Sequence, residues 1–399
     1  MNLIWSHDHY FIFDISTKRY YSEIEFGYNV WERYLNSFER ITIISRVIER
    51  SLTSEERNKY NLSSGPKINF IHLPNINNLK GKIVNHFNVK SEINIAVNNA
   101  DAVISRLPSQ IGMMVLKTAK RLKVPSAVEL VGCPDEALSN LKSLKAKLYK
   151  PYMVKETKKY VKESPFTLYV TKRYLQSKYP TFGKSVSCSN VILKNTAISK
   201  PVIKKESGQL KTIIGLIGYL SEYKGIDTAY KICLELEKAS IDYRLEILGG
   251  GDKEKWYDLA DSLGIEKERI KIHTLPSGDA VIEWIKNIDI YIQPSRTEGL
   301  PRGLIEAMSV GKASVGSNVG GIPELLSADN VFDKEDFISM SKRVIEIIRD
   351  TKLRSSLALE NQETAKEYSF GKLEEKRKIF WHDFYNYSLL IKEKRELCE

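Results

Sequence analysis

Two glutamates, Glu298 and Glu306, stand eight positions apart around a turn rich in glycine and proline. The segment Pro294–Met308, PSRTEGLPRGLIEAM, leaves an apolar run with strand character and enters a helical pattern. A helix that begins after such a turn presents free backbone N–H groups, which suit an anion. A carboxylate accepts hydrogen bonds from pairs of hydroxyls, so one glutamate can hold a sugar and the other a ribose. The alternative makes Glu298 a helix-dipole partner and Glu306 a surface residue, and the density of strand, turn and helix signals argues against it.

A second candidate segment, GYLSEYKG at residues 218–225, follows another apolar run and opens a helix expected at Ile226–Glu237. Glycine lets a phosphate approach the backbone, and Lys224 can neutralise a diphosphate. A solvated lysine at a helix start is the alternative role for Lys224, and the sequence leaves both open. The later cluster Gly249–Gly251 lacks the spacing of a dinucleotide fingerprint, which indicates a tight turn between strand and helix.

Histidines suggest a third site, because His7 and His9 flank Asp8 after the first expected strand. Two imidazoles two positions apart could both bind a metal, but we favour acceptor contact or a structural role. No two aspartates are spaced two apart, and the four cysteines show neither metal spacing nor a disulfide framework. The sequence therefore predicts no metal and no cofactor, and a reduced, cytoplasmic protein.

Alternating strand and helix patterns must position these residues. They predict an α/β fold with two doubly wound domains, whose ligands bind at the carboxyl ends of the strands. Helices are expected at Glu25–Phe38, Gln110–Leu122, Ile226–Glu237 and Leu304–Val310, the last capped by Gly311. Strands are expected at Leu3–Trp5, Ile41–Ser45, Ile68–Leu73, Ala102–Ser105, Ala127–Val131, Thr167–Val170, Thr212–Ile217, Arg244–Leu248, Ile270–Ile272, Ile288–Gln293 and Ala313–Gly316.

The 399 residues suggest two domains with a core each. A run with Pro201, Ser207, Gly208 and three lysines has little to bury, which indicates a linker. We expect an amino-terminal domain at residues 1–194, a linker at 195–210 and a carboxyl-terminal domain at 211–379. The final helix, about 380–399, is expected to pack back on the first domain.

These motifs together resemble a retaining nucleotide-sugar glycosyltransferase of the GT-B fold, family four. The first domain matches more loosely, in a way that resembles a bacterial surface-polysaccharide branch, through Arg106–Ser109, Glu129–Pro134 and Leu168–Thr171. In the second domain the resemblance is carried by Gly218, Lys224, Leu248–Gly251, Pro294–Ser295, Glu298–Gly299, Glu306–Met308, Gly311 and Gly320–Glu324.

The resemblance implies two Rossmann-like domains facing a cleft, with a nucleotide-diphosphate sugar, UDP-sugar favoured, as co-substrate. Glu298 would contact hydroxyls of the donor sugar, Glu306 the ribose, and Lys224 the diphosphate; Glu298 and Lys224 are the expected catalytic residues. In such a retaining reaction a diphosphate oxygen takes the acceptor's proton, so no side-chain base is nominated. The full expected donor site is Gly218, Tyr219, Lys224, Thr274, Leu275, Glu298, Gly299, Leu300, Pro301, Arg302, Gly303, Leu304 and Glu306.

The acceptor is expected to be a polysaccharide precursor, growing or lipid-linked, near His7, His9, Arg106 and Asp135. Two departures from the family pattern concern these sites. Tyr219 stands where the family often has arginine, and Gly132–Asp135 occupies the region where many members carry a histidine. A non-catalytic subunit that binds or stabilises a partner transferase is therefore the alternative function.

Net charge divides unevenly, with +15 in residues 1–200 and −4 in residues 201–399. No nucleic-acid-binding signature accompanies this excess, so an anionic membrane is the expected partner. The segment Leu138–Lys162 holds eight lysines and one acidic residue, Glu156. Leu138, Leu141, Leu144, Leu148 and Tyr152 recur at helical steps, and Pro151 is expected to divide the segment into two helices. An amphipathic helix packed on the sheet is the alternative. The membrane prediction places the protein at the inner face of the membrane, as a peripheral protein.

Overall fold

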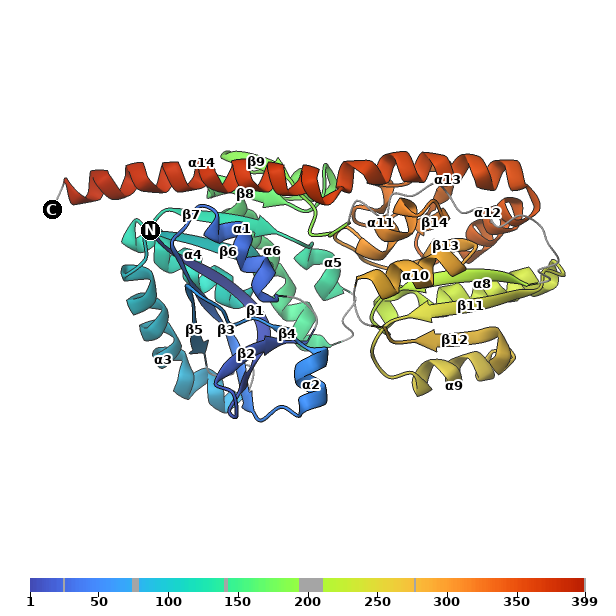
Figure 1. Cartoon of the computed structure of the whole chain (residues 1–399), viewed down its shortest axis with the longest axis horizontal. Helices are drawn as coiled ribbons and strands as arrows, with labels where there is room; N and C mark the ends of the chain where they lie inside the picture. The colour runs from blue at the N-terminus through green and yellow to red at the C-terminus, as the bar shows by residue number, and fades with distance from the viewer. Residues whose placement is uncertain (24–25, 74–78, 140–142, 194–210, 276–277, 398–399) are drawn as a thin grey trace.

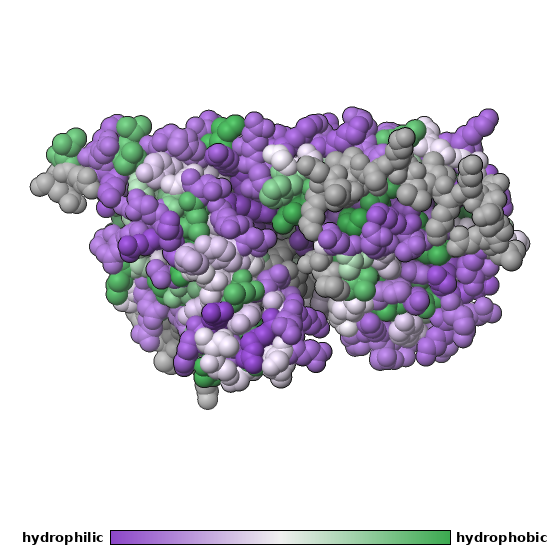
Figure 2. Space-filling view, in the orientation of Figure 1, coloured by the Kyte–Doolittle hydropathy of each residue, from purple (hydrophilic) through white to green (hydrophobic). Residues whose placement is uncertain are grey.

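The computed structural model describes residues 1–23, 26–73, 79–139, 143–193, 211–275 and 278–397. The expected linker at 195–210 lies outside these residues. Two α/β domains stand side by side, each built on a largely parallel sheet (Figure 1). Figure 2 shows a notch between them along one edge of the molecule. The α/β class expected from the alternating patterns is confirmed.

The amino-terminal sheet has nine strands, and its parallel part runs β5-β3-β1-β6-β7-β8-β9. The short strand β2 pairs antiparallel with the far half of β1, and β4 pairs antiparallel with β2. The strands are β1 (Asn2–Asp14), β2 (Arg19–Ser22), β3 (Arg40–Arg50), β4 (Asn61–Leu62), β5 (Ile68–Leu73), β6 (Ala102–Leu107), β7 (Ser126–Leu130), β8 (Phe166–Tyr169) and β9 (Lys184–Ser187). The helices are α1 (Tyr28–Leu35), α2 (Ser54–Lys59), α3 (Leu79–Asn98), α4 (Gln110–Leu122), α5 (Pro134–Ser139), α6 (Leu144–Glu163) and α7 (Tyr174–Lys178).

Strand β1 is far longer than the expected Leu3–Trp5. Its pairing with β3 shifts between Ser6 and Tyr10, where three residues of β1 face a single residue of β3. His7, Asp8 and His9 therefore form a bulge inside the strand, not a loop after it. The residues beyond continue as a strand because β3 and the β2 hairpin supply backbone partners.

The carboxyl-terminal sheet has six parallel strands in the order β12-β11-β10-β13-β14-β15. The order reverses between β10 and β13, and ligands of doubly wound sheets bind at this switch point. The strands are β10 (Thr212–Ile217), β11 (Tyr243–Leu248), β12 (Ile270–His273), β13 (Ile290–Gln293), β14 (Ala313–Ser317) and β15 (Val331–Phe332). The α-helices are α8 (Ile226–Lys238), α9 (Glu254–Ser262), α10 (Asp279–Asn287), α11 (Arg302–Ser309), α12 (Phe337–Arg349), α13 (Thr351–Ala365) and α14 (Phe370–Glu396). Short 3₁₀ turns are η2 (Glu222–Lys224), η3 (Lys267–Arg269), η4 (Ile322–Glu324), η5 (Ala328–Asn330) and η6 (Lys366–Tyr368).

Helices α13 and α14 follow one another along the same side of both domains (Figure 1). Helix α14 leaves the carboxyl-terminal domain and lies on the amino-terminal one, where Phe384 contacts Phe38 and Phe166. A single hydrophobic cluster therefore includes side chains of both domains, among them Trp31, Ile104, Leu304 and Trp381. Gly311, which follows α11, has φ +71° and confirms the expected left-handed cap.

Helix α6 contradicts the expectation that Pro151 divides it, because the helix is continuous from Leu144 to Glu163. The break falls earlier, between the end of α5 at Ser139 and the start of α6. One proline removes one backbone donor, and the flanking turns keep the remaining helical bonds. Within the described ranges no helix is long and apolar enough to cross a membrane.

Candidate active site

Two loops meet at the switch point of the carboxyl-terminal sheet. Strands β10 and β13 are paired neighbours, so the loop after Ile217 and the loop after Gln293 lie side by side. The first contains Gly218 and Lys224, and the second contains Glu298. Lys224 and Glu298, 74 positions apart in sequence, are thus brought to one point by the parallel order of the strands.

Lys224 and Glu298 form an ion pair there, with 2.6 Å between Nζ and Oε1. Both side chains are largely enclosed, at 13% and 9% exposure. Gly218 makes room for the lysine, because a Cβ at this position would lie 2.8 Å from Cδ of Lys224. The ammonium group and the nearby backbone N–H groups can bind a diphosphate, and the carboxylate can accept hydrogen bonds from the hydroxyls of an attached sugar.

Buried side chains of β13 and the residues after it orient Glu298. Ser295 donates to Oε1 of Glu298 at 2.7 Å, and the amide of Gln293 donates to the same oxygen at 3.1 Å. Tyr291 donates to the amide oxygen of Gln293 at 2.6 Å, which orients that amide. Sequence analysis missed this chain. Residues 291 and 293 of β13 and residue 295, just after it, carry polar groups at every second position, and this spacing is the signal that could have found it.

Helix α11 starts beside this pair with open backbone donors. Its N-cap, Pro301, offers no side-chain acceptor, and no acidic residue lies in the first turn. The first N–H groups are therefore available to an anion. Gly303 packs against β10, where a Cβ would lie 2.8 Å from that of Ile217. Arg302 is exposed, and Leu304 is buried in the core.

Glu306 lies on α11, one turn further from the loop. Burial of its carboxyl group raises the pKa of Glu306 above the ordinary 4.5, and the nearby charge of Arg302 opposes this. A carboxyl group held in such surroundings gains from hydrogen-bond donors such as ribose hydroxyls.

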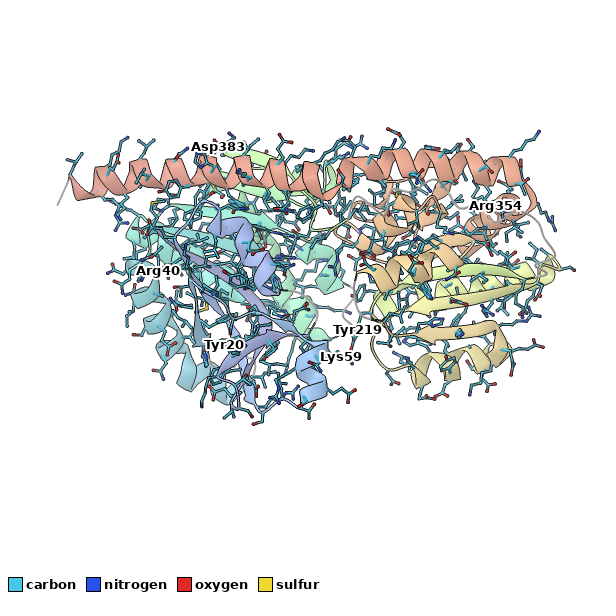
Figure 3. The ribbon with its side chains drawn as sticks, viewed as in Figure 1. Tyr20, Arg40, Lys59, Tyr219, Arg354 and Asp383 are labelled. Carbon is cyan, nitrogen blue, oxygen red and sulfur yellow. The ribbon has the colours of Figure 1, made fainter. Side chains whose placement is uncertain are left out.

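The remaining expected donor residues surround the loops. The hydroxyl of Thr274 donates to the carbonyl of Gly249 at 3.1 Å, and Leu275 is exposed beside it. Gly249 itself packs on the carbonyl of Gly218, where a Cβ would lie only 1.8 Å away. Tyr219 is exposed on the edge that faces the other domain (Figure 3).

Loop 294–298 is fixed to α8 by Arg296, which forms a two-pronged ion pair with Asp227 at 2.6 and 2.8 Å. Its Nε also contacts Glu335 at 2.5 Å. These partners raise the pKa of Arg296, with the bond to Asp227 as the largest cause. Arg296 is thus a structural brace of the candidate site.

The acceptor-side candidates lie in the other domain, and three of them gather around the β1 bulge. His7 is enclosed, and burial first, then the charges of Arg106, His9 and Arg46, lowers its pKa well below 6.5. His9 bonds the hydroxyl of Ser22 at 2.8 Å, and Arg106 lies over the ring of Phe26. His7 is therefore a neutral imidazole at neutral pH.

Asp135 does not join this group. It lies in the first turn of α5 and pairs with Lys150 at 2.7 Å, which lowers its pKa. Asp8, between the two histidines, caps α4 by accepting from the backbone of Gln110 and Ile111 at 2.6 and 3.1 Å. Over the part of the chain that the structure describes, no group of three or more potential ligands is arranged for a metal ion.

Known proteins resemble this chain in sequence and fold. The model of the family described as Glycosyl transferases group 1 matches residues 199–364. Protein CapJ of Staphylococcus aureus is 30% identical over 372 residues, which cover 92% of this chain and 93% of CapJ. The N,N'-diacetylbacillosaminyl-diphospho-undecaprenol alpha-1,3-N-acetylgalactosaminyltransferase of Campylobacter jejuni is 31% identical over 102 residues, 24% of this chain and 27% of its own. The crystal structure of Anabaena HepE in complex with UDP-glucose matches with a TM-score of 0.63 and 12% identity, over 94% of this chain and 98% of HepE.

Proposed function

This chain belongs to the group 1 glycosyl transferases, and on that premise we propose that it transfers a sugar to a surface polysaccharide precursor. The donor is a nucleotide-diphosphate sugar, and a UDP-sugar is favoured because HepE was crystallised with UDP-glucose. The acceptor class is lipid-linked, in keeping with the diphospho-undecaprenol acceptor that the name of the Campylobacter relative states.

The pair Lys224 and Glu298 beside the open start of α11 is the observation that carries this proposal. The barrier of such a transfer lies in charge that grows on the leaving diphosphate and on an oxocarbenium-like sugar. Preorganised N–H groups and a lysine stabilise the first, and a carboxylate stabilises the second. When the donor enters, its diphosphate competes with Glu298 for the ammonium group of Lys224.

The proposed reaction retains the configuration at the anomeric carbon and needs no metal. A diphosphate oxygen takes the proton of the acceptor hydroxyl as that hydroxyl attacks the anomeric carbon from the same face. Lys224 and the α11 amides meet the diphosphate charge. Turnover is therefore expected to survive EDTA, and loss of turnover that Mn²⁺ or Mg²⁺ restores would contradict this part.

A thermal-shift panel of UDP, GDP and their common sugar conjugates tests the donor. A ligand at 100 times its dissociation constant stabilises the folded chain by about 2.7 kcal/mol, which ranks the candidates. Slow hydrolysis of the bound donor by the purified chain supports an enzyme. Donor binding without hydrolysis or transfer would favour the non-catalytic subunit instead.

We further propose that α6 docks on an anionic membrane at the inner face. Leu144, Leu148 and Tyr152 are 71%, 75% and 54% exposed, although they are large and apolar. The helix buries its other face, through Ala146, Met153, Thr157, Tyr160 and Val161. Helical spacing places Lys155, Lys159 and Lys162 on the same stripe as the exposed apolar residues. An ordinary amphipathic helix would bury its leucines against the sheet, so this arrangement supports docking.

Liposome co-sedimentation tests the docking face. Binding is expected to need anionic lipid, to fall with salt, and to weaken when Lys155, Lys158, Lys159 and Lys162 become glutamine, at about 1 kcal/mol for each lysine. The matched control changes four exposed lysines of the other domain, Lys238, Lys267, Lys271 and Lys352, and should leave binding unchanged. Equal binding to neutral and anionic vesicles would refute docking without touching the donor site.

A further inference from the structure

Glu324 links the two domains through an unusual set of hydrogen bonds. It ends the 3₁₀ turn η4 of the carboxyl-terminal domain. Its carboxylate accepts three consecutive backbone N–H groups of the amino-terminal domain, from Lys172 at 2.5 Å, Arg173 at 2.9 Å and Tyr174 at 2.6 Å. Bonds from backbone N–H to a carboxylate are charge-assisted and stronger than neutral ones. This carboxylate therefore fixes the turn between β8 and α7 to the other domain.

The turn before Glu324 rests directly on the Glu298 loop. Gly321 donates its backbone N–H to the carbonyl of Gly299 at 2.7 Å. Gly320 has φ +56°, and a Cβ there would lie 2.1 Å from the carbonyl oxygen of Glu298. The backbone of Glu298 and Gly299 is thus held from one side by the segment that carries Glu324.

The amino-terminal domain contacts the same loop from the other side. Thr297 donates to the carboxylate of Glu136 at 3.2 Å. A Cβ at Gly299 would lie 2.5 Å from the carbonyl oxygen of Val131, so the two backbones touch. Leu300 packs against the amino-terminal core cluster that contains Val170. Residues 297–300 are therefore held between the two domains.

We propose that Glu324 is a positioning residue for sugar transfer. By clasping residues 172–174, its carboxylate sets the distance between the Glu298 loop and the acceptor-side domain. The inference rests on the proposed function, because only a transfer between ligands of the two domains requires that distance. Nucleotide binding needs the carboxyl-terminal domain alone and should not depend on Glu324.

Hydrogen exchange measured by mass spectrometry on the full chain tests directly whether the amides of residues 172–174 are bonded to Glu324. Glu324→Ala should make the amides of residues 172–174 and of Gly321 exchange roughly tenfold faster, since those protons lose their acceptor or its support. Glu324→Gln keeps one carbonyl oxygen and should give an intermediate rate. The matched control is Asp350→Ala, because Asp350 also accepts two backbone N–H groups, from Lys352 and Leu353, but within its own domain.

The same variants are then compared for UDP affinity and for turnover of whichever donor the parent chain uses. We expect Glu324→Ala to slow turnover by about 10- to 100-fold, as misplaced reactants do, with UDP affinity unchanged and partial rescue in Glu324→Gln. Asp350→Ala should lower thermal stability and leave turnover at the parent level.

Several results would overturn the proposal. Unchanged exchange at residues 172–174 in Glu324→Ala would show that the clasp does not form in solution. Faster exchange with parent turnover, or an equal loss of turnover in Asp350→Ala, would reduce Glu324 to a stabilising contact. Failure of the parent chain to bind UDP would contradict the proposed donor, and the exchange rates would still decide whether Glu324 holds the two turns.

Discussion

One oxygen of Glu298, Oε1, accepts from Lys224, Ser295 and Gln293. These three donors fix the carboxylate and aim its second oxygen away from them. An amide in this place turns half of an acceptor into a donor and removes the negative charge beside the cation that develops in the proposed transfer.

Glu298→Gln should therefore lower turnover by about 100- to 1000-fold while the fold stays intact. Release of the nucleotide from a nucleotide-sugar donor measures turnover, and the thermal midpoint shows whether the fold is intact. Glu283→Gln, an exposed change on α10, is the control. A Glu298→Gln variant with the parent rate would show that the role assigned to Glu298 is wrong.

The raised pKa of Glu306 makes the stability of the unliganded chain depend on pH. Below pH 4.5 both the folded and the unfolded chain carry a protonated Glu306, so burial costs nothing. As pH rises above 4.5 the unfolded chain ionises first, and the folded chain loses stability until its own, higher pKa is passed. Glu306→Gln removes this loss, so it should be more stable than the parent at neutral pH and no more stable below pH 4. Thermal midpoints measured across this range check the difference.

Glu306 also predicts nucleoside selectivity. Glu306→Ala should weaken binding of the ribonucleotide, and UDP and its 2′-deoxy analogue should then bind equally well, because the partner of the hydroxyl is gone. Isothermal titration of both nucleotides on both variants measures this. If the parent chain binds the two nucleotides equally well, Glu306 does not bind the 2′-hydroxyl of the ribose.

Sequence analysis reached single residues of this site where their types were chemically unusual. Lys224 and Glu298 come from separate motifs, and the structure places them 2.6 Å apart. The contacts of Gln293 and Ser295 with Glu298 were not predicted, because a short polar side chain near a strand end has many ordinary explanations. Glu324 was part of the family resemblance, but its bonds to the other domain were not predicted, because its partners lie 150 or more positions away and local patterns carry no information about contacts of that range.

Among elements, the junction between η2 and α8 combines a left-handed backbone with a close approach to another loop. Gly225 has φ +70°, and a Cβ there would lie 1.9 Å from the carbonyl oxygen of Pro294. This close approach joins the Lys224 loop to the Glu298 loop. Only glycine satisfies both the positive φ and the contact.

Gly225→Ala should therefore destabilise the chain by more than the left-handed conformation alone, which costs about 1–2 kcal/mol. Gly264→Ala is the matched control, because Gly264 has φ +76° with open space around its Cβ position. Denaturant unfolding gives the free energy of unfolding of both variants. The extra loss in Gly225→Ala is the cost of the contact between its Cβ and the carbonyl oxygen of Pro294. An equal loss of stability in the two variants would mean that the Lys224 and Glu298 loops can move apart at no cost. UDP affinity of Gly225→Ala would then stay at the parent level.

Elements with strong local patterns were predicted well, and those that depend on partners were not. Helix α4 matches its predicted range Gln110–Leu122, because its apolar spacing and its Ser109 cap are both local. Strand β1 was predicted too short because its second half is stabilised by β3 and a hairpin that the sequence pattern does not show. Pro151 was given too much weight, since α6 buries residues on both sides of it, Ala146 before and Met153 and Thr157 after.

At the scale of the whole molecule, α14 decides whether the domains behave as one body. The helix is continuous with the carboxyl-terminal domain in sequence, yet its aromatic face lies on the amino-terminal domain. Trp381 is fully buried against Tyr34, at 5.6 Å between ring centroids. Lys184 and Asp383 pair at 2.7 Å across the same contact. The clasp at Glu324 and this helix therefore bridge the domains at two separate places.

Trp381→Ala should lower the free energy of unfolding by about 3–5 kcal/mol, the usual cost of removing a buried large aromatic side chain. The effect should appear in the amino-terminal domain, although residue 381 follows the other domain in sequence. Hydrogen exchange should accelerate in α1 and β8, whose Tyr34 and Phe166 face the helix, and remain slow in β10 and β11. Ile379→Ala, an exposed change on the same helix, should leave both domains unchanged. If Trp381→Ala instead loosened the carboxyl-terminal sheet, α14 would be an appendage of that domain, and its packing on the amino-terminal one would contribute little to folding.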